Sequence, residues 1–256
     1  MSERVVEIER RGRVAVLRFD RPPVNAIDRE AATLLEAAFT EAIDDPDVGA
    51  IVVTGTGSTF SAGLDLVAVP AYGADEQRAL INDLNGMIAR LYGCKKPTVA
   101  AVNGHAIAGG LVLALACDRR IGTRKKCRIG LTEARVGIPF PIGPLTVVRT
   151  ELDPSVARSL VLLARNLDHP ADAVRAGILD ELVASKRLLD RAVEVAEDLA
   201  AMPSEAYGRI KRQLRGEAVA RIEAAVAHGT DPLLEGWLTG EASEASRGVL
   251  AGERET

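Results

Sequence analysis

The chain has 256 residues, of which 47% are hydrophobic and 3% aromatic, and it carries a formal net charge of −4. This composition supplies a large, mostly aliphatic core, enough for one large domain or two modest ones. The Lys and Arg residues are scattered and form no cluster of the kind that binds nucleic acid, which leaves a small molecule as the expected partner.

The sequence contains no recognisable targeting segment and no metal-binding pattern. Residues 1–13 are highly charged and lack the apolar stretch of a secretory signal. The longest apolar run, Ala106–Cys117, is too short to span a bilayer and predicts a buried helix. The three cysteines have no CxxC spacing, and the three histidines lie far from any zinc-ligand pattern. We therefore expect a cytoplasmic protein with reduced thiols, no membrane segment and no metal site.

The first predicted elements are two strands and a helix. Residues 5–8 and 14–19 have strand character on either side of a turn at Gly12. Asp28 can then cap a helix, because apolar residues recur after it at the spacing of one helix face. Asp45–Pro46 ends this helix, since proline disfavours helical angles in the residue before it.

Two short apolar runs, Ala50–Thr54 and Thr98–Val102, show no alternation of apolar and polar residues. Such runs are typical of strands buried on both faces, as in a parallel sheet, and their alternation with helices predicts an α/β architecture. From Pro154 onward the apolar spacing is helical almost throughout, and Ile178–Val183 alone has strand character. The sequence thus predicts an α/β core followed by a helical C-terminal region, with separate apolar faces over 188–199, 206–214 and 219–226.

Glycine-bearing loops follow both predicted buried strands, over Gly55–Leu66 and Asn103–Leu111. Neither loop contains a phosphate-binding P-loop or a dinucleotide fingerprint. A nucleophile elbow at Ser61 fails because Thr59 stands where the GxSxG motif needs glycine, so a catalytic pair of Ser61 and His105 is a weak hypothesis.

A different function is open to these loops if the two strands are neighbours. Glycine permits close approach of a ligand to peptide N–H groups, and two such loops could direct two N–H groups at one oxygen. The amide of Gly109 would also lie near the positive end of the following helix. This is the arrangement of an oxyanion hole, which stabilises negative charge on a reacting carbonyl. From the residues alone, tight turns remain the simpler explanation of the glycines.

Four segments resemble motifs of the enoyl-CoA hydratase/isomerase (crotonase) family, in the family's order and spacing. They are Pro23–Ala26, Phe60–Leu66, Asn103–Gly110 with Cys117–Asp118, and Leu131–Gly137. The first is similar to the segment beside the nucleotide moiety of coenzyme A, and the others are similar to the family's signature sequences. The resemblance extends from about Val5 to Val183.

The resemblance implies an overall fold and a substrate. Residues 1–185 would form an α/β, crotonase-like ββα-spiral core that binds an acyl-CoA thioester. Residues 186–256 would form a helical trimerisation region, in a homotrimer or homohexamer. Coenzyme A would enter as part of the substrate, with no tightly bound cofactor.

The same resemblance implies the site residues. The backbone amides of Leu64 and Gly109 would form the oxyanion hole, and Glu133 would be the catalytic acid and base. Contacts to coenzyme A would come from Ala26, Ala62, Gly63, Asp65 and Leu66. Asp65 is itself expected to orient its loop rather than to take part in the chemistry.

The expected reaction depends on the number of glutamates in the site. Hydratases of this family use two, and one of these positions, three residues after Gly109, is Val112 here. Valine cannot transfer a proton, which leaves Glu133 alone. A single carboxylate fits a Δ3,Δ2-enoyl-CoA isomerase of fatty-acid metabolism, in which it removes a proton from C2 and returns one to C4. The segment Ile129–Ile138 is also similar to that branch.

Two other functions stay open: a hydratase or other crotonase-type lyase that works with Glu133 alone, and a non-catalytic acyl-CoA-binding protein. Glu133 could also be an exposed carboxylate paired with Arg135 or Arg128. If it lies in the site, apolar neighbours such as Ile138 and Phe140 would raise its pKa.

Other residues near the motifs have simpler expected roles. His105 is expected to be structural, and Lys95, Lys96 and Arg21 are expected to be solvated surface charges rather than ligands of coenzyme A phosphates. Asp118 is expected to bond to backbone at a helix-to-strand junction.

The segment after Glu133 departs from the family pattern. Where the family has a glycine-rich turn, this chain has Pro139–Pro144, with three prolines. Because proline restricts the backbone, we expect the acyl pocket to be reshaped there, which leaves the preferred chain length open.

Overall fold

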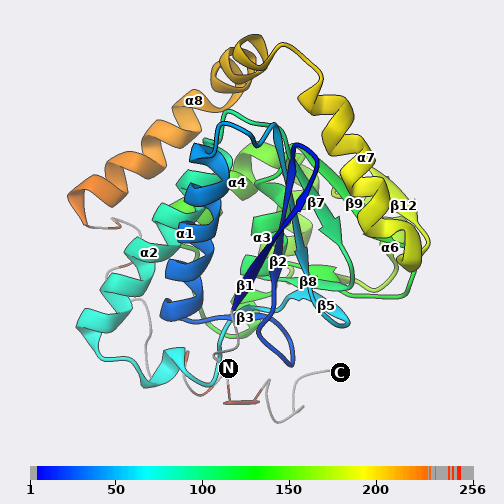
Figure 1. The fold of residues 1–256 in the computed structure, drawn as a ribbon. Helices are drawn as coiled ribbons and strands as arrows, with labels where there is room; N and C mark the ends of the chain where they lie inside the picture. Colours follow the sequence, from blue (N-terminus) through cyan, green and yellow to red (C-terminus); the bar gives the residue numbers. More distant parts are fainter. Residues whose placement is uncertain are drawn as a thin grey trace.

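The computed structural model describes residues 5–229 and, beyond them, Asp231, Leu234, Ala242, Glu244, Arg247 and Gly248. Figure 1 shows a central sheet with helices on both sides and a long helix, α8, that lies beside α2.

The main sheet has six strands in the order β1-β2-β4-β7-β9-β12. They are β1 (Val6–Arg11), β2 (Val14–Phe19), β4 (Ala50–Gly55), β7 (Thr98–Val102), β9 (Arg119–Thr123) and β12 (Glu181–Val183). The β1 strand is antiparallel to β2, whereas adjacent strands from β2 to β12 are parallel. The two predicted buried strands, β4 and β7, are confirmed, and the structure shows that they are neighbours, with Ile51 opposite Thr98.

Side chains alternate between the two faces of each central strand, as the pleat requires. On one face Val52 and Val99 pack with α7 (Leu188–Ala200). On the other face Val53 and Ala100 belong to the larger core that contains residues of α1, α2 and α3. Helices on both faces explain why every residue of β4 and β7 is buried.

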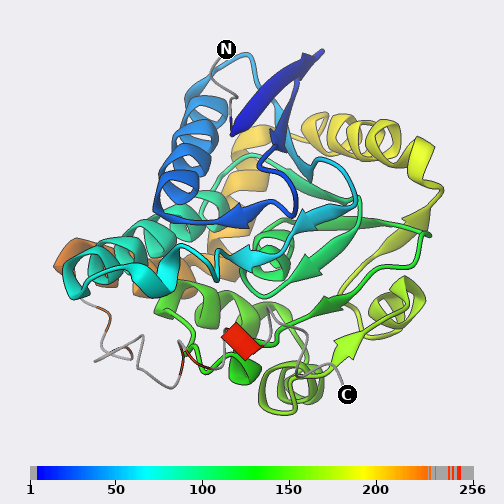
Figure 2. The same cartoon turned by 90° about the horizontal axis from the view of Figure 1, so that it is seen from below.

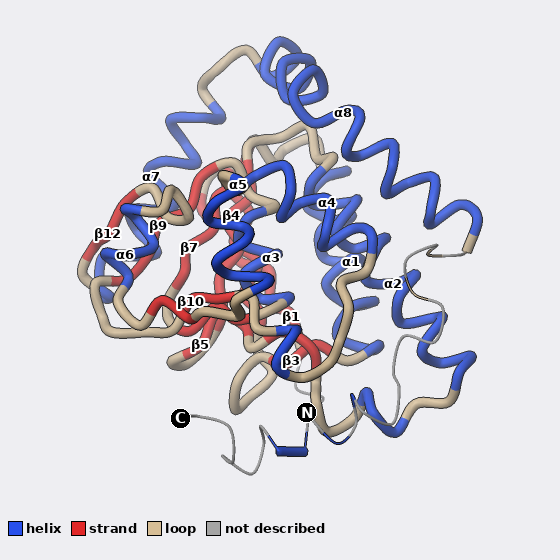
Figure 3. The backbone as a smooth tube through the Cα atoms, turned by 180° about the vertical axis from the view of Figure 1, so that it is seen from behind, coloured by secondary structure: helices blue, strands red, loops and turns tan. Residues whose placement is uncertain are grey.

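Two smaller sheets lie at one end of the main sheet, where Figure 3 shows β5 and β10 crossing below β7. One has the order β11-β10-β8-β5, and the other pairs β3 with β6. Their strands are β3 (Ala26–Ile27), β5 (Thr59–Ser61), β6 (Gly63–Leu64), β8 (His105–Ile107), β10 (Ile129–Gly130) and β11 (Asn166–Leu167). Both glycine-bearing segments, expected as loops, thus contain short strands, and the pairing of β5 with β8 holds the two segments side by side.

The other described elements are helical. The α-helices are α1 (Arg29–Asp44), α2 (Ala74–Tyr92), α3 (Gly109–Leu115), α4 (Ile142–Glu151), α5 (Pro154–Ala157), α6 (Pro170–Arg175), α7 (Leu188–Ala200) and α8 (Ser204–His228). Shorter helical turns span Val69–Ala71, Glu133–Arg135, Arg158–Leu162 and Ser185–Arg187. As predicted, the Asp28 carboxylate caps α1 by accepting a hydrogen bond from the Ala31 N–H.

Three predicted elements differ from the structure. The helix expected over Ala106–Cys117 begins at Gly109, because His105–Ile107 pairs as a strand with β5 and β10. The faces over 206–214 and 219–226 belong to one continuous helix, α8. The strand expected over Ile178–Val183 is confined to β12, since the Ile178 N–H bonds to a carbonyl at the end of α6.

A buried cluster of charges attaches α8 to the core. Asp118, between α3 and β9, pairs with Lys211 (2.8 Å) and Arg215 (2.7 Å) of α8. Arg215 also pairs with Glu151 of α4 (3.0 Å). Asp118 accepts a hydrogen bond from the Thr98 N–H, as predicted, and its two ion pairs go beyond that prediction.

The expected C-terminal region begins at residue 186, but α7 packs directly on the main sheet. Seen from below, α7 lies on the opposite side of the sheet from α1 and α2 (Figure 2). Much of the chain after residue 229 lies outside the described residues, and a role of residues 186–256 in trimerisation stays a prediction. Among the described helices, none combines the length and apolar composition that crossing a membrane requires.

Candidate active site

The first glycine-bearing segment is held in place by Asn25. This side chain is fully buried, and its amide donates hydrogen bonds to backbone carbonyls of the segment. The Ser61 hydroxyl donates to the Asn25 carbonyl (2.7 Å) and accepts from the Gly63 N–H (3.1 Å). His105 also has a structural role, because its Nδ1 accepts a hydrogen bond from the backbone N–H of Arg128 (3.0 Å). The structure therefore gives Ser61 and His105 positioning roles and no support as a catalytic pair.

The second segment passes close to the first, and glycines permit this approach. A Cβ on Gly110 would lie 2.1 Å from the Ser61 carbonyl oxygen, so no side chain fits there. A Cβ on Gly63 would lie 2.8 Å from the backbone nitrogen of Gly109, so a side chain at Gly63 would cover that amide. Gly109 is the first residue of α3, where an N–H has no acceptor within the helix.

The turn into α3 is made by Ala108, with φ 52° and ψ −128°. Residues with a Cβ rarely adopt such angles, which cost on the order of 1–3 kcal/mol and persist only where the surroundings impose them. Ala108 is the single residue between β8 and α3, so its angles set the direction of the Gly109 peptide. Backbone strain is thus located at the amide that the sequence assigns to the oxyanion hole.

An apolar cavity of about 250 Å³ lies beside the two segments. Among the described residues that line it, the polar side chains are those of Thr132 and Glu133. The apolar lining includes Ala62, Leu64, Leu66, Gly109 and Val112 from the two segments, Leu84, Met87 and Ile88 from α2, and Pro139, Phe140, Pro141 and Pro144. Five predicted site residues, which are Ala62, Leu64, Leu66, Gly109 and Glu133, therefore meet at one cavity.

Three predicted coenzyme A contacts, Ala26, Gly63 and Asp65, lie beside this cavity without lining it. Ala26 pairs with Gly63 between β3 and β6. Asp65 accepts hydrogen bonds from two N–H groups of the next turn and pairs with Arg21 (2.8 Å). Burial by itself would raise the pKa of Asp65, but these hydrogen bonds hold it below its ordinary value. Asp65 therefore orients its loop, as predicted.

Two of the three side chains that were expected to be solvated surface charges, Arg21 and Lys96, bind to other groups of the protein instead. Arg21 bridges the carboxylates of Asp28 (2.6 Å) and Asp65 (2.8 Å). The Lys96 ammonium donates to two carbonyls at the C-terminal end of α1. The prediction of solvated charges is wrong for both, because acceptors from other elements surround them, whereas Lys95 is exposed.

Glu133 is the carboxyl of the cavity. It lies in a helical turn, its residue is 8% exposed, and its Oε2 has no hydrogen-bond partner among the described residues. Burial raises its pKa to about 8, which confirms the expected effect of apolar surroundings. The alternative of an exposed carboxylate paired with Arg135 or Arg128 is wrong, because Glu133 is buried. Arg135 bonds to the Ala164 carbonyl, and Arg128 pairs with Asp168.

Thr132 also lines the cavity, and the motifs give no role to it. Its position next to Glu133 in the Leu131–Gly137 motif is the signal that could have identified it. The same holds for Asn25, which lies within the Pro23–Ala26 motif and fixes the first segment.

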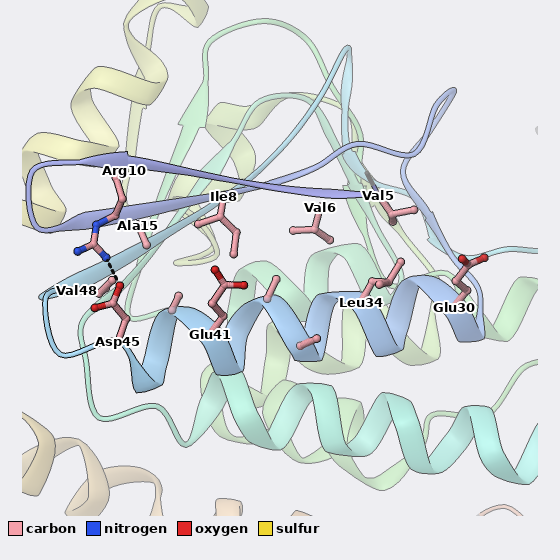
Figure 4. Close-up of a pocket in the computed structure, with 13 residues that line it drawn as sticks. Val5, Val6, Ile8, Arg10, Ala15, Glu30, Leu34, Glu41, Asp45 and Val48 are labelled. Carbon is pink, nitrogen blue, oxygen red and sulfur yellow. Dashed lines mark hydrogen bonds and ion pairs between the residues drawn. The ribbon is translucent and has the colours of Figure 1, made fainter. Parts of the chain in front are cut away.

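A second groove lies between β1 and α1, as Figure 4 shows. Its acidic residues Glu30 and Glu41 are exposed, and Arg10 and Asp45 form an ion pair of 2.8 Å at one end. None of the predicted site residues lines it. The described part of the chain also contains no group of His, Cys, Asp and Glu residues that could hold a metal ion. The cavity at Glu133 is therefore the candidate active site.

Sequence comparisons agree with the four motifs. The sequence model of the enoyl-CoA hydratase/isomerase family matches residues 9–247. A carnitinyl-CoA dehydratase from Salmonella paratyphi A is 31% identical over 224 residues, which cover 87% of this chain and 84% of the relative. A putative enoyl-CoA hydratase from Thermus thermophilus is 36% identical over 200 residues, or 77% of this chain and 78% of the relative.

Solved structures agree with the fold. An enoyl-CoA isomerase from Mycobacterium tuberculosis superimposes with a TM-score of 0.80 at 29% identity, covering 88% of this chain and 97% of that one. Human mitochondrial Δ3,Δ2-enoyl-CoA isomerase has a TM-score of 0.84 over 98% of both chains, and at 24% identity it supports the fold alone. The crotonase-like fold is thus confirmed, and the chain belongs to the enoyl-CoA hydratase/isomerase family.

Proposed function

We propose that this chain is a Δ3,Δ2-enoyl-CoA isomerase in which Glu133 transfers the proton. The observation that carries the proposal is a lone carboxyl in an apolar cavity, since Glu133 is the one acidic side chain among the described lining residues. The family's hydratases use two glutamates, and the second position is Val112 here. Val112 is fully buried and lines the same cavity, so it offers no group that could activate water.

In the proposed reaction, the thioester oxygen of a 3-enoyl-CoA accepts hydrogen bonds from the Leu64 and Gly109 amides. The ionised Glu133 removes a proton from C2, and the remaining electron pair delocalises as a dienolate onto that oxygen. Glu133 then returns the proton to C4, which moves the double bond from C3–C4 to C2–C3 without gain or loss of atoms. Preorganised N–H donors are usually the largest contribution to such catalysis, and positioned proton transfer adds about 10²–10⁴-fold.

The acidity of Glu133 supports this role. A group that must both accept and release a proton works best when its pKa lies near the working pH. Burial raises the pKa of Glu133 to about 8, so both of its forms are populated slightly above neutral pH. A carboxyl in water, with a pKa near 4.5, would be a weaker base for a carbon acid.

Coenzyme A is proposed to approach along the strand pair β3–β6. The pairing of Ala26 with Gly63 places the backbone of Ala26 and of Ala62–Leu66 together at the side of the cavity, where adenine contacts are expected. The family's enzymes act on coenzyme A thioesters, and the substrate would bring its own coenzyme A. A cytoplasmic homotrimer or homohexamer is part of the same proposal.

A hydratase is the second candidate, because relatives of this chain are named a dehydratase and a putative hydratase. It would have to add water with Glu133 as its one carboxyl. A non-catalytic acyl-CoA-binding protein is the third candidate.

Incubation with a 3-enoyl-CoA and, separately, a 2-enoyl-CoA distinguishes the three functions by product mass. We expect a 2-enoyl product of unchanged mass from the first substrate, and loss of at least about 10²-fold in kcat in Glu133→Gln. Glu217→Gln, an exposed isosteric control on α8, should retain full turnover.

Two other outcomes would replace the isomerase proposal. Addition of one water to the 2-enoyl substrate, without isomerisation of the 3-enoyl substrate, would make the chain a hydratase. Absence of both reactions, combined with thermal stabilisation by acyl-CoA, would make it a binding protein.

A further inference from the structure

Asp231 and Ala242, which lie beyond α8, contact the segment 137–144, and Pro139, Phe140, Pro141 and Pro144 of this segment form one wall of the cavity. The Asp231 carboxylate accepts hydrogen bonds from the Ile142 N–H (2.6 Å) and from the Asn85 side-chain amide (3.3 Å), both through Oδ2. Leu234 and Ala242 are 8% and 1% exposed and belong to the main core. A Cβ on Gly137 would lie 3.2 Å from the Cα of Ala242, so this part of the chain packs next to the segment after Glu133.

Asn85 holds the same wall from the opposite side. It lies on α2, is 2% exposed, and accepts the Gly143 N–H (2.8 Å) through Oδ1. A Cβ on Gly143 would lie 2.8 Å from that oxygen, so glycine is required for this contact. Its neighbours on α2, Leu84 and Met87, line the cavity.

These hydrogen bonds hold the middle of the wall, at Ile142 and Gly143, in place. Ile142 and Gly143 are the first two residues of α4, and their N–H groups would have no acceptor within the helix. Pro141, the N-cap residue, offers no side-chain acceptor. The residues on either side of Ile142 and Gly143, which are Phe140, Pro141 and Pro144, line the cavity. Leu84, Met87 and Ile88 of α2 line it from the other side, so the contact between α4 and α2 sets the width of the cavity.

We propose that Asp231 and Asn85 form a clamp that limits the length of the acyl group. The inference rests on the proposed acyl-CoA site at Glu133 and identifies its substrate class as uncharged aliphatic acyl groups that fit about 250 Å³. Glu133, the proposed acid and base, is the one ionisable side chain among the described lining residues. The cavity therefore offers no further side chain that could form an ion pair with a charged acyl group. Asp231 and Asn85 are positioning residues, because they act through the proline-rich wall.

The test compares short and long acyl groups in Asp231→Ala and Asn85→Ser. Both variants release the wall, so we expect the ratio of kcat/KM for a long to a short 3-enoyl-CoA to rise at least about tenfold, as for changes of a few methylenes in an apolar pocket. The ratio of the Kd for palmitoyl-CoA to the Kd for butyryl-CoA, measured by calorimetry, should fall, because release of the wall strengthens binding of the longer chain. Asp231→Asn keeps an oxygen for the Ile142 N–H and should restore most of the original ratio.

Asp153→Ala is the matched control, because Asp153 also accepts an N–H at the start of a helix, that of Ser155 in α5, and no residue of α5 lines the cavity. Its length profile should equal that of the wild type. Unchanged ratios in Asp231→Ala and Asn85→Ser, or an equal loss for all lengths, would overturn the clamp.

The two proposals can fail separately in this experiment. Saturated acyl-CoAs require no turnover, so the Kd ratios test the clamp even if the wild type does not isomerise 3-enoyl-CoA. An active wild type whose variants keep the original length ratios would refute the clamp and leave the isomerase proposal standing.

Discussion

Glu133 lines the cavity and Asp65 follows β6 beside it, and their surroundings shift the pKa values of these two carboxyls in opposite directions. Asp65 receives hydrogen bonds from backbone N–H groups and Arg21, which hold its pKa below the ordinary value despite burial. Glu133 is buried without such donors at Oε2, and its pKa rises to about 8. The environment thus separates a permanently ionised loop residue from a carboxyl that can exchange a proton near neutral pH.

The raised pKa of Glu133 predicts how stability changes with pH. The folded chain binds this proton more tightly than the unfolded chain, so the free energy of unfolding falls as pH rises from 4.5 to about 8. Glu133→Gln removes this dependence. The difference between wild type and variant should therefore change by about 1.4 kcal/mol per pH unit in that interval, in favour of the variant.

Urea unfolding at several pH values measures this difference. The exposed Glu217→Gln variant is the control, and its difference from the wild type should not change with pH. A constant difference between the wild type and Glu133→Gln would mean that Glu133 ionises as it does in water.

Among the secondary-structure elements, α3 begins with two glycines, Gly109 and Gly110, that differ in how closely they approach the segment over residues 61–63. Gly110 faces the Ser61 carbonyl, whereas a Cβ on Gly109 would meet only the Cα of Gly63, at an ordinary 3.6 Å. Ala108 carries the positive φ between them and β8. Adjacent glycines therefore have different reasons to be glycine.

Alanine substitution at these two glycines should separate the reasons. Gly110→Ala forces β5 and α3 apart and should lower the free energy of unfolding by about 1–3 kcal/mol, as overpacking does. Gly109→Ala should change it by less than about 1 kcal/mol, because the added methyl makes ordinary contact and alanine favours the helix. Chemical denaturation of both variants checks this order, and equal losses would contradict it.

In the molecule as a whole, buried ion pairs attach α8 to the core, and these differ from the ion pair on the exposed side of the same helix. Lys211 and Arg215 have side chains that are 8% and 11% exposed, and both pair with Asp118. The Arg209–Glu205 pair on the same helix is 73% and 80% exposed. Desolvated charges depend strongly on their partners, whereas exposed pairs contribute little.

Removing one acid from each pair tests this attachment. Asp118→Ala leaves the buried Lys211 ammonium without its carboxylate and should cost about 3–5 kcal/mol in the free energy of unfolding. Glu205→Ala should cost no more than about 1 kcal/mol. Urea unfolding compares the two, and similar small costs would show that α8 is held by apolar contacts instead.

Elements with a local pattern can be predicted from the sequence. Unalternated apolar runs identified β4 and β7, and a capping aspartate followed by helical spacing identified α1. Resemblance of four motifs identified the family and named Leu64, Gly109 and Glu133 before their positions were known. The structural inferences succeed because burial on both faces of a strand requires an unbroken apolar run, and burial of one helix face requires apolar residues at helical spacing.

Contacts between segments that are distant in sequence become visible only in the folded chain. The short strands β5 and β8 have too few residues to show a period, and they form because each completes the other's backbone hydrogen bonds. The angles of Ala108 are imposed by the turn between β8 and α3, and no side-chain pattern encodes them. Asp231 meets Ile142 across 89 positions of sequence, because packing of the whole chain, not local spacing, brings a carboxylate to an N–H of α4 that has no acceptor within its own helix.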